Sequence, residues 1–431
     1  MRHYLLYSSI AIALLVTGCD KDEASLPQLK STTYSAGTLT VNYCGDEMPS
    51  KQIVFTPSAV ASDGEQTATL EMSGILDLSS LGIKDIPMLP APGVLPGDKT
   101  TTLSIALVPD KKEGVYTFAG NDKTQYVTFS YTGELSDSHL TINIEDVKLL
   151  DSSLAGKVFN PVPVEASLED LKKPENIKTP FYIRWEIGNL PGLELNPGII
   201  INALTLAPII PVYNNTAYSS PAQVFDQCVQ TMALLPNGNI PVRYYSNHEG
   251  ATQLLTTNPN MLQYVVTGQN TLQVYINPLS AVGLWLVAQS KPTWLPSFFD
   301  TAYAETIKQQ IADSNPANTS EADEAIKNAL IQSLLLAIKP AMSDGLPLEF
   351  TPTDDGINLY LTTETCTDFI GILLGEMVKQ PAIAQRLAQY LTQAGLTQED
   401  VAELIQNIPA ILQATTKLNI GLSLQNYTLQ Q

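Results

Sequence analysis

Five aromatic residues fall within residues 281–303 and are the strongest candidates for ligand contact. The segment reads AVGLWLVAQSKPTWLPSFFDTAY. Exposed aromatic rings can stack on a sugar face, and an apolar groove can hold a lipid tail. We therefore expect the segment either to contact a glycan or small apolar molecule or to pack between two domains. The aromatic residues are Trp285, Trp294, Phe298, Phe299 and Tyr303.

A second apolar segment, GIIINALTLAPIIPVY at residues 198–213, is interrupted by Pro208 and Pro211. It is longer than an ordinary strand and has few polar residues. We expect a buried strand followed by a loop, packed between domains. The alternative is that it forms one wall of the apolar groove.

Groups for catalysis are sparse. The chain holds three histidines, and no HExxH, GxSxG or P-loop motif is present. We expect His139 at a strand edge and His248 in a solvated loop. The 43 acidic residues could supply a glycosidase pair, but no pair stands out, and Asp354 and Asp355 fit a hairpin turn. We predict no catalytic residue, metal or cofactor.

The N-terminus predicts a lipid anchor. A basic tip, Arg2 and His3, precedes the mostly apolar residues 4–16, which are fewer than the ~20 needed to span a bilayer as a helix. That length suits a secretory signal. The ending Val16-Thr17-Gly18-Cys19 resembles the lipobox of bacterial lipoproteins, which implies cleavage before Cys19 and lipid on its thiol.

The net charge of −20 argues against nucleic acid as a partner, because binding to phosphates depends on lysine and arginine. It also argues against attachment to anionic lipids through a basic patch, so we expect the protein to attach to its membrane partner through the lipid anchor.

Three further cysteines, Cys44, Cys228 and Cys366, are widely spaced. We expect all three to be ordinary packed cysteines with free thiols. The alternative is that two of them form one disulfide.

Residues 34–160 predict an antiparallel β-barrel or sandwich. Short runs alternate apolar and polar residues with a period of two and are separated by glycine, proline and aspartate. Seven runs stand out, at residues 38–43, 52–57, 67–74, 101–107, 115–120, 125–133 and 139–147.

The stretches TYSAGTLTVNYCG (33–45) and YTGELSDSHLTINIEDV (131–147) resemble the calycin-like, or lipocalin-like, N-terminal β-domains of a Bacteroidota surface lipoprotein family. The Gly-x-Trp signature of true lipocalins is missing, which leaves barrel and sandwich open. Lys21-Asp22-Glu23 resembles the surface-export signal of the same lineage, which implies the outer face of the outer membrane. Asp300-Thr301-Ala302 is similar to its O-glycosylation acceptor and implies a sugar on Thr301.

The second half predicts an α+β domain of β-hairpins with inserted and appended helices. Hairpins are expected in residues 231–245, 262–278 and 348–363, with two-residue turns at Asn237-Gly238 and Asp355-Gly356. Gly395 predicts a helix end, and Thr397 with Asp400 a helix start. Strands are expected at residues 181–188 and 418–427, and helices at 320–339, 368–379, 381–394 and 397–412.

These expectations divide the chain into a signal peptide (1–18), a lipidated tether (19–33), the β-domain (34–160), a proline-rich linker (161–180) and the α+β domain (181–431). The favoured function is that of a non-enzymatic surface lipoprotein that binds a glycan or a small apolar molecule. A structural or adhesive subunit similar to fimbrillins, or a glycan hydrolase, are the alternatives.

Overall fold

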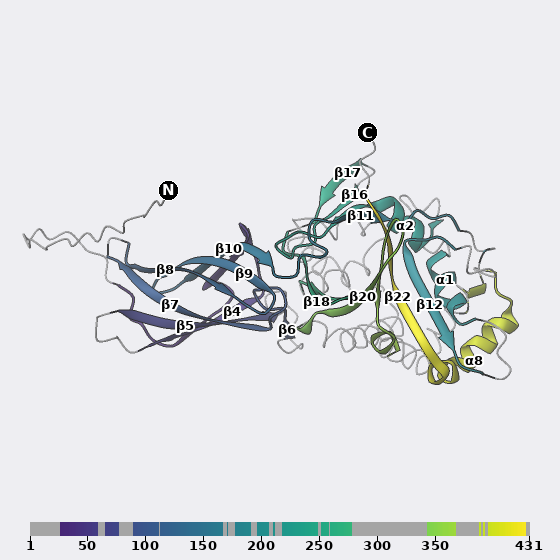
Figure 1. Cartoon of the computed structure of the whole chain (residues 1–431), viewed down its shortest axis with the longest axis horizontal. Coiled ribbons are helices and arrows are strands. Elements are labelled where there is room, and N and C mark those ends of the chain that lie inside the picture. The colour runs from purple at the N-terminus through teal and green to yellow at the C-terminus, as the bar shows by residue number, and fades with distance from the viewer. Residues whose placement is uncertain are drawn as a thin grey trace, which may run out of the picture.

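The computed structural model is mostly β, and its strands form two large curled sheets, each a half-barrel (Figure 1). Cys19, the aromatic segment 281–303 with Thr301, and the helix expected at 320–339 lie outside the described residues. So do the helix at 368–379 and most of that at 381–394. The structure describes residues 26–58, 65–76, 89–111, 113–166, 170, 177–190, 196–206, 210–211, 218–248, 251–257, 259–277, 343–367, 388, 391–392 and 395–427.

The first sheet contains all seven strands expected from the alternating runs. Its order is β1-β4-β5-β7-β8-β9-β10-β2-β3, with β6 paired to β5. Neighbours are antiparallel except β2 and β10, which run parallel. The strands are β1 (Thr32–Tyr34), β2 (Leu39–Tyr43), β3 (Asp46–Glu47), β4 (Lys51–Pro57), β5 (Gln66–Leu76), β6 (Leu89–Ala91), β7 (Thr100–Asp110), β8 (Val115–Lys123), β9 (Val127–Leu135) and β10 (Leu140–Leu149).

Strand β7 produces much of the curl of this sheet. Its residues Thr100 to Leu107 pair with β5, whereas Val108 to Asp110 pair with β8. Alternate side chains along β7 are buried and exposed, as a period of two requires. The inward side chains of the sheet fill its interior, and they include the fully buried Tyr43, Phe55, Leu70, Met72, Leu103 and Leu140.

The second sheet has the order β17-β16-β15-β11-β22-β21-β20-β19-β18, with β12 also paired to β22. The chain passes from the first sheet to the second between Leu149 and Val158. The strands are β11 (Val158–Pro161), β12 (Phe181–Ile187), β15 (Val229–Ala233), β16 (Val242–His248), β17 (Ala251–Thr256), β18 (Leu262–Gly268), β19 (Thr271–Ile276), β20 (Leu346–Pro352), β21 (Gly356–Leu361) and β22 (Thr415–Asn426), and β13 (Ile210–Pro211) pairs separately with β14 (Tyr218–Ser219).

All three expected hairpins are present, as β15–β16, β18–β19 and β20–β21. The two-residue turn predicted at Asn237-Gly238 is wrong, because only Gly238 has a positive φ. Leu235 C=O accepts from Gly238 N–H at 3.0 Å, and Leu235 N–H donates to Asn239 C=O at 2.9 Å. Pro236 therefore occupies the second position of a longer turn that ends at Gly238. The turn predicted at Asp355-Gly356 lies one residue earlier, because Thr353 N–H donates to Gly356 C=O at 3.0 Å and encloses Asp354 and Asp355. None of Asp354, Asp355 and Gly356 has a positive φ.

The segment from Gly198 is not the strand that we expected. It forms helix α1 (Gly198–Leu206). Helix α1 packs against both strand β12 and helix α2 (Pro221–Cys228). A continuous apolar run does not distinguish a buried strand from a buried helix. The missed signal is Asn196-Pro197, because Asn196 Oδ1 accepts from Gly198 N–H at 2.8 Å and proline is favoured at the first helical position.

Helix α1 and helix α8 (Gln398–Ala414) lie on the side of β12 away from the first sheet (Figure 1). Helix α8 begins where Thr397 and Asp400 predicted. A second core lies between these helices and the sheet, and it is separate from the core of the first sheet. Its buried members include Trp185, Leu206, Ala222, Cys366, Leu404, Ile411 and Leu418.

The two sheets are joined by a shared core and by polar contacts. Tyr264 and Leu272 of the second sheet belong to the same buried cluster as Tyr43 of the first. The buried Asn260 side chain donates to the main-chain carbonyl of Asp46 at 3.0 Å. Figure 1 shows the junction between the end of the first half-barrel and strand β18.

No helix among the described residues is long and apolar enough to cross a membrane.

Candidate functional site

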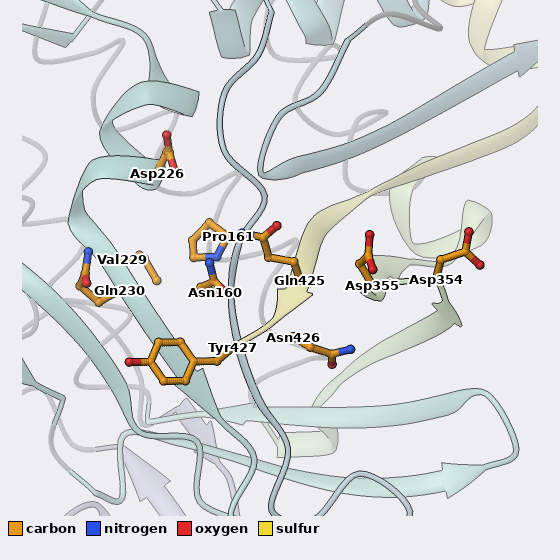
Figure 2. Close-up of a pocket in the computed structure, with 10 residues that line it drawn as sticks. All are labelled: Asn160, Pro161, Asp226, Val229, Gln230, Asp354, Asp355, Gln425, Asn426 and Tyr427. Atoms are coloured by element: carbon orange, nitrogen blue, oxygen red, sulfur yellow. The ribbon is translucent and has the colours of Figure 1, made fainter. Parts of the chain in front are cut away.

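A polar cleft of about 740 Å³ opens where the end of β22 meets β11, α2 and the β20–β21 turn (Figure 2). We call it the β22 cleft. Side chains with amide, carboxylate or phenol groups make up most of its lining. The lining residues are Asn160, Pro161, Asp226, Val229, Gln230, Asp354, Asp355, Gln425, Asn426 and Tyr427.

The floor of the cleft is held by main-chain pairing. Asn160 of β11 lies opposite Gln425 of β22 in the antiparallel register. Asn426 N–H donates to Asp355 C=O at 2.7 Å, and Tyr427 N–H donates to Val158 C=O at 2.9 Å. These bonds fix the end of β22 between β11 and the β20–β21 turn. The final described residues of the chain are thus part of the site.

Asp226 reaches the cleft from α2. This helix starts with a capping box in which the Ser220 and Gln223 side chains bond to each other's backbone N–H groups at 3.1 and 3.0 Å. Asp226 Oδ2 accepts a bond of 3.3 Å from Val164 N–H. That bond orients the carboxylate at the cleft.

Tyr427 provides an aromatic surface at the rim, with 41% of its area exposed. An aromatic ring with a polar hydroxyl can contact both an apolar face and a hydrogen-bonding group of a ligand. Large apolar side chains with comparable exposure are few in the described part of the chain, namely Val108, Leu150 and Leu254. None of these three lines the cleft.

The carboxylates lie on two sides of the cleft. Figure 2 shows Asp354 and Asp355 at one side and Asp226 at the other, with Asn160 and Gln425 between them. Across the described ranges, no three Asp, Glu, His or Cys residues gather closely enough to hold a metal ion. The arrangement instead offers hydrogen-bond acceptors and amide donors along an extended path.

A shallower hollow of about 480 Å³ lies on β8, β9 and β10. Asp146, which has a φ of 51° at a bulge in β10, accepts a bond of 3.0 Å from Ser130 Oγ. Two lysines and two aspartates share this lining, so its charges balance locally. The lining residues are Asn121, Asp122, Lys123, Thr128, Phe129, Ser130, Asp146 and Lys148.

The two histidines that the structure describes, His139 and His248, do not line the β22 cleft. His139 precedes β10, and its Nε2 lies 2.9 Å from Thr40 Oγ1, a contact between neighbouring strands of the first sheet. The loop position expected for His248 is wrong, because His248 is the last residue of β16 and pairs with Ala251 of β17. The strand-edge position predicted for His139 agrees with this contact.

The thiols of Cys44, Cys228 and Cys366 are free and at least partly buried, as the prediction of packed cysteines required. Burial raises the pKa of each thiol above its ordinary value, and that of Cys366 to about 11. A thiol is a poor nucleophile until it ionises. These cysteines therefore serve packing.

Sequence reasoning placed Asp354 and Asp355 in a hairpin turn and attributed no ligand contact to them. The turn is confirmed, but both residues also line the β22 cleft. The other lining residues, such as Asn160 and Gln230, are distant in sequence and form no motif. Only the pairing of β22 with β11 and β21 brings them together.

No family model matches the chain, and neither a curated protein nor a solved structure is significantly similar to it.

Proposed function

We propose that this protein is a lipid-anchored protein of the outer-membrane surface that binds a glycan in the β22 cleft without chemical turnover. One observation carries the proposal. The cleft places amide and carboxylate side chains along an extended path beside the exposed ring of Tyr427.

A glycan fits this lining better than an apolar molecule. Sugar hydroxyls both donate and accept hydrogen bonds, so they suit Asn160, Gln230 and Gln425, whose amides do the same. Carboxylates accept bonds from hydroxyls. An apolar ligand would leave these groups desolvated without partners, which costs free energy for each group.

The location rests on the sequence. The signal-like segment ending at Cys19, with Lys21-Asp22-Glu23 behind it, supports lipid attachment and export to the cell surface. The strongly acidic chain supports attachment through acyl chains, because anionic lipids would repel it. We also propose that the first sheet is a calycin-like domain of the Bacteroidota surface lipoproteins and that the second unit belongs to the α+β class.

We keep the aromatic residues from Trp285 to Tyr303 as a second predicted contact surface for the glycan. Thr301 remains a predicted O-glycosylation site. Neither is needed for the argument from the β22 cleft.

Binding can be tested with the purified full-length protein on an array of glycans, in a detergent that has no sugar headgroup. We expect Tyr427→Ala to weaken binding to the selected glycan about fivefold, because stacking contributes on the order of 1 kcal/mol. Tyr427→Phe keeps the ring and should retain most of the affinity. A protein that binds no glycan, or an alanine variant that binds like the parent, would contradict the proposal.

The anchor can be tested by a Cys19→Ser variant. We expect the parent to fractionate with the outer membrane and to be accessible to protease on intact cells. The variant should lose the lipid and leave the membrane fraction, because no basic patch can replace the acyl chains.

A further inference from the structure

We infer that the β22 cleft selects glycans that carry free amino groups and rejects anionic glycans. This inference rests on the proposed function, because it specifies which saccharides the same cleft accepts. The geometry that carries it is the combination of acceptors on two sides of one extended cleft with described lining residues among which none is basic.

The charge in the lining has one sign. Asp226, Asp354 and Asp355 are the charged residues among the ten that line the cleft. The shallower hollow on β8 to β10 differs, because its aspartates are accompanied by Lys123 and Lys148. A cleft whose walls carry one sign of charge concentrates ligands of the opposite sign.

Among the described residues, none forms an ion pair with the three carboxylates. In the part of the chain that the structure describes, the ion pairs lie elsewhere, and none includes a cleft aspartate. A ligand ammonium group would therefore supply the first close positive charge. The pairs are Lys99–Asp344, Lys178–Glu165 and Arg184–Glu186.

The positions of the carboxylates indicate an oligosaccharide with amino groups on more than one ring. Asp354 and Asp355 come from the β20–β21 turn, and Asp226 comes from α2 on the opposite side. The volume of about 740 Å³ exceeds what a single sugar ring requires. The amides of Asn160 and Gln425, which lie between the two sides, can bind hydroxyls of the rings that connect the amino groups.

An anionic glycan meets the opposite situation. Its carboxylate or sulfate groups would approach three aspartates in a protein whose net charge is −20. Among the described lining residues there is no lysine, arginine or histidine that could compensate this repulsion. Neutral glycans fall between the two classes, because they use the amides and Tyr427 without gain or loss from charge.

The test compares three tetrasaccharides of equal length by calorimetry with the full-length protein in mildly acidic, low-salt buffer. A glucosamine tetramer carries ammonium groups, its N-acetylated form is neutral, and a galacturonate tetramer is anionic. We expect the glucosamine tetramer to bind about tenfold more tightly than the neutral one, because several weak exposed ion pairs act together. The galacturonate tetramer should not bind, and added salt should reduce the preference.

Two variants locate the effect. The double substitution Asp354→Asn and Asp355→Asn should remove most of the preference for the glucosamine tetramer and leave binding of the neutral tetramer within about twofold. Asp122→Asn, in the shallower hollow, is the matched control and should preserve the preference. An equal loss in the control would overturn the inference, since the preference would then follow overall charge.

The two proposals fail differently. If the neutral tetramer binds at the β22 cleft but the glucosamine tetramer binds no better, or the galacturonate tetramer binds as well, selection by charge is wrong and glycan binding stands. If none of the tetramers binds and the glycan array is also blank, the proposed function itself is wrong.

Discussion

The hydroxyl of Tyr43, a fully buried residue of β2, donates a 2.5 Å hydrogen bond to the main-chain carbonyl of Asn237 in the β15–β16 turn. This bond connects the two sheets across 194 positions of sequence. Nearby, the side chain of Asn260 donates to the carbonyl of Asp46. Because the core is also continuous across this junction, the two sheets should unfold together.

Removal of the Tyr43 hydroxyl tests this coupling. We expect Tyr43→Phe to lower the free energy of unfolding by about 1–3 kcal/mol, because the partly buried carbonyl of Asn237 loses its partner. Denaturant unfolding followed by fluorescence and circular dichroism measures the change. Tyr360→Phe, which removes an exposed hydroxyl 2.9 Å from Thr351 Oγ1, is the control and should cost less. Two separate transitions in the parent would contradict a shared unit.

The turn that accepts this bond makes a second prediction. Gly238 has a φ of 83°, and a Cβ there would lie 3.1 Å from both Pro96 Cγ and the Tyr264 carbonyl oxygen. Gly238→Ala should therefore destabilise the protein by more than about 1 kcal/mol, through backbone strain and crowding at the junction. The melting temperature should fall accordingly.

A matched substitution controls for the loss of glycine itself. Gly37 also has a positive φ, but nothing lies within 4 Å of the position of its Cβ. Gly37→Ala should show the backbone strain without the crowding, so its loss of stability should be the smaller of the two. Equal losses would show that crowding between the sheets contributes nothing.

The helix start at Thr397 shows what the sequence can predict. Thr397 Oγ1 accepts from Asp400 N–H at 3.1 Å, and Asp400 Oδ2 accepts from Thr397 N–H at 3.2 Å. Just before it, Gly395 has a φ of 91° and ends the preceding helix. These features were predictable because every atom involved lies within a few residues of the others.

Thr397→Ala should therefore lower the free energy of unfolding by about 1 kcal/mol, because the first turn of α8 loses its acceptor. Thr397→Ser keeps the hydroxyl and should retain nearly all of the stability. Chemical denaturation of the three proteins decides the matter, and an alanine variant as stable as the parent would show that the capping box contributes nothing.

Features that depend on contacts between residues distant in sequence were harder to predict. The apolar run from Gly198 is a helix because it packs on β12 and α2, and its composition alone suited a strand equally well. The β22 cleft was not foreseen at all. Asn160, Asp226 and Gln425 become neighbours only through the order of strands around β22, and no local pattern encodes that order.

Lys51 makes the last prediction, which concerns pH. Its side chain is buried, and Nζ donates to the carbonyls of Pro92 at 2.7 Å and Gly93 at 2.9 Å. Gly74 of β5 pairs with Lys51 and allows Pro92 to approach the sheet closely, because a Cβ at Gly74 would lie 2.0 Å from the Pro92 carbonyl oxygen. Burial lowers the pKa of Lys51 from 10.5 to about 7.

Between pH 7 and 10.5 the unfolded chain thus binds a proton at Lys51 that the folded chain does not. The contribution of Lys51 to the free energy of unfolding should therefore rise with pH across that window, by up to about 1.4 kcal/mol per pH unit. In Lys51→Met the rise should disappear, although Pro92 and Gly93 lose their donor and the variant is less stable at high pH.

The measurement is the difference in unfolding free energy between parent and variant at several pH values, which cancels the titration of the tyrosines and cysteines common to both. Lys148→Met, at an exposed lysine, controls for the loss of a lysine charge without the loss of a buried side chain. A flat difference for Lys51→Met would mean that Lys51 keeps its ordinary pKa in the folded protein. The segment at Pro92 would then be held by hydrogen bonds from a fully charged ammonium group.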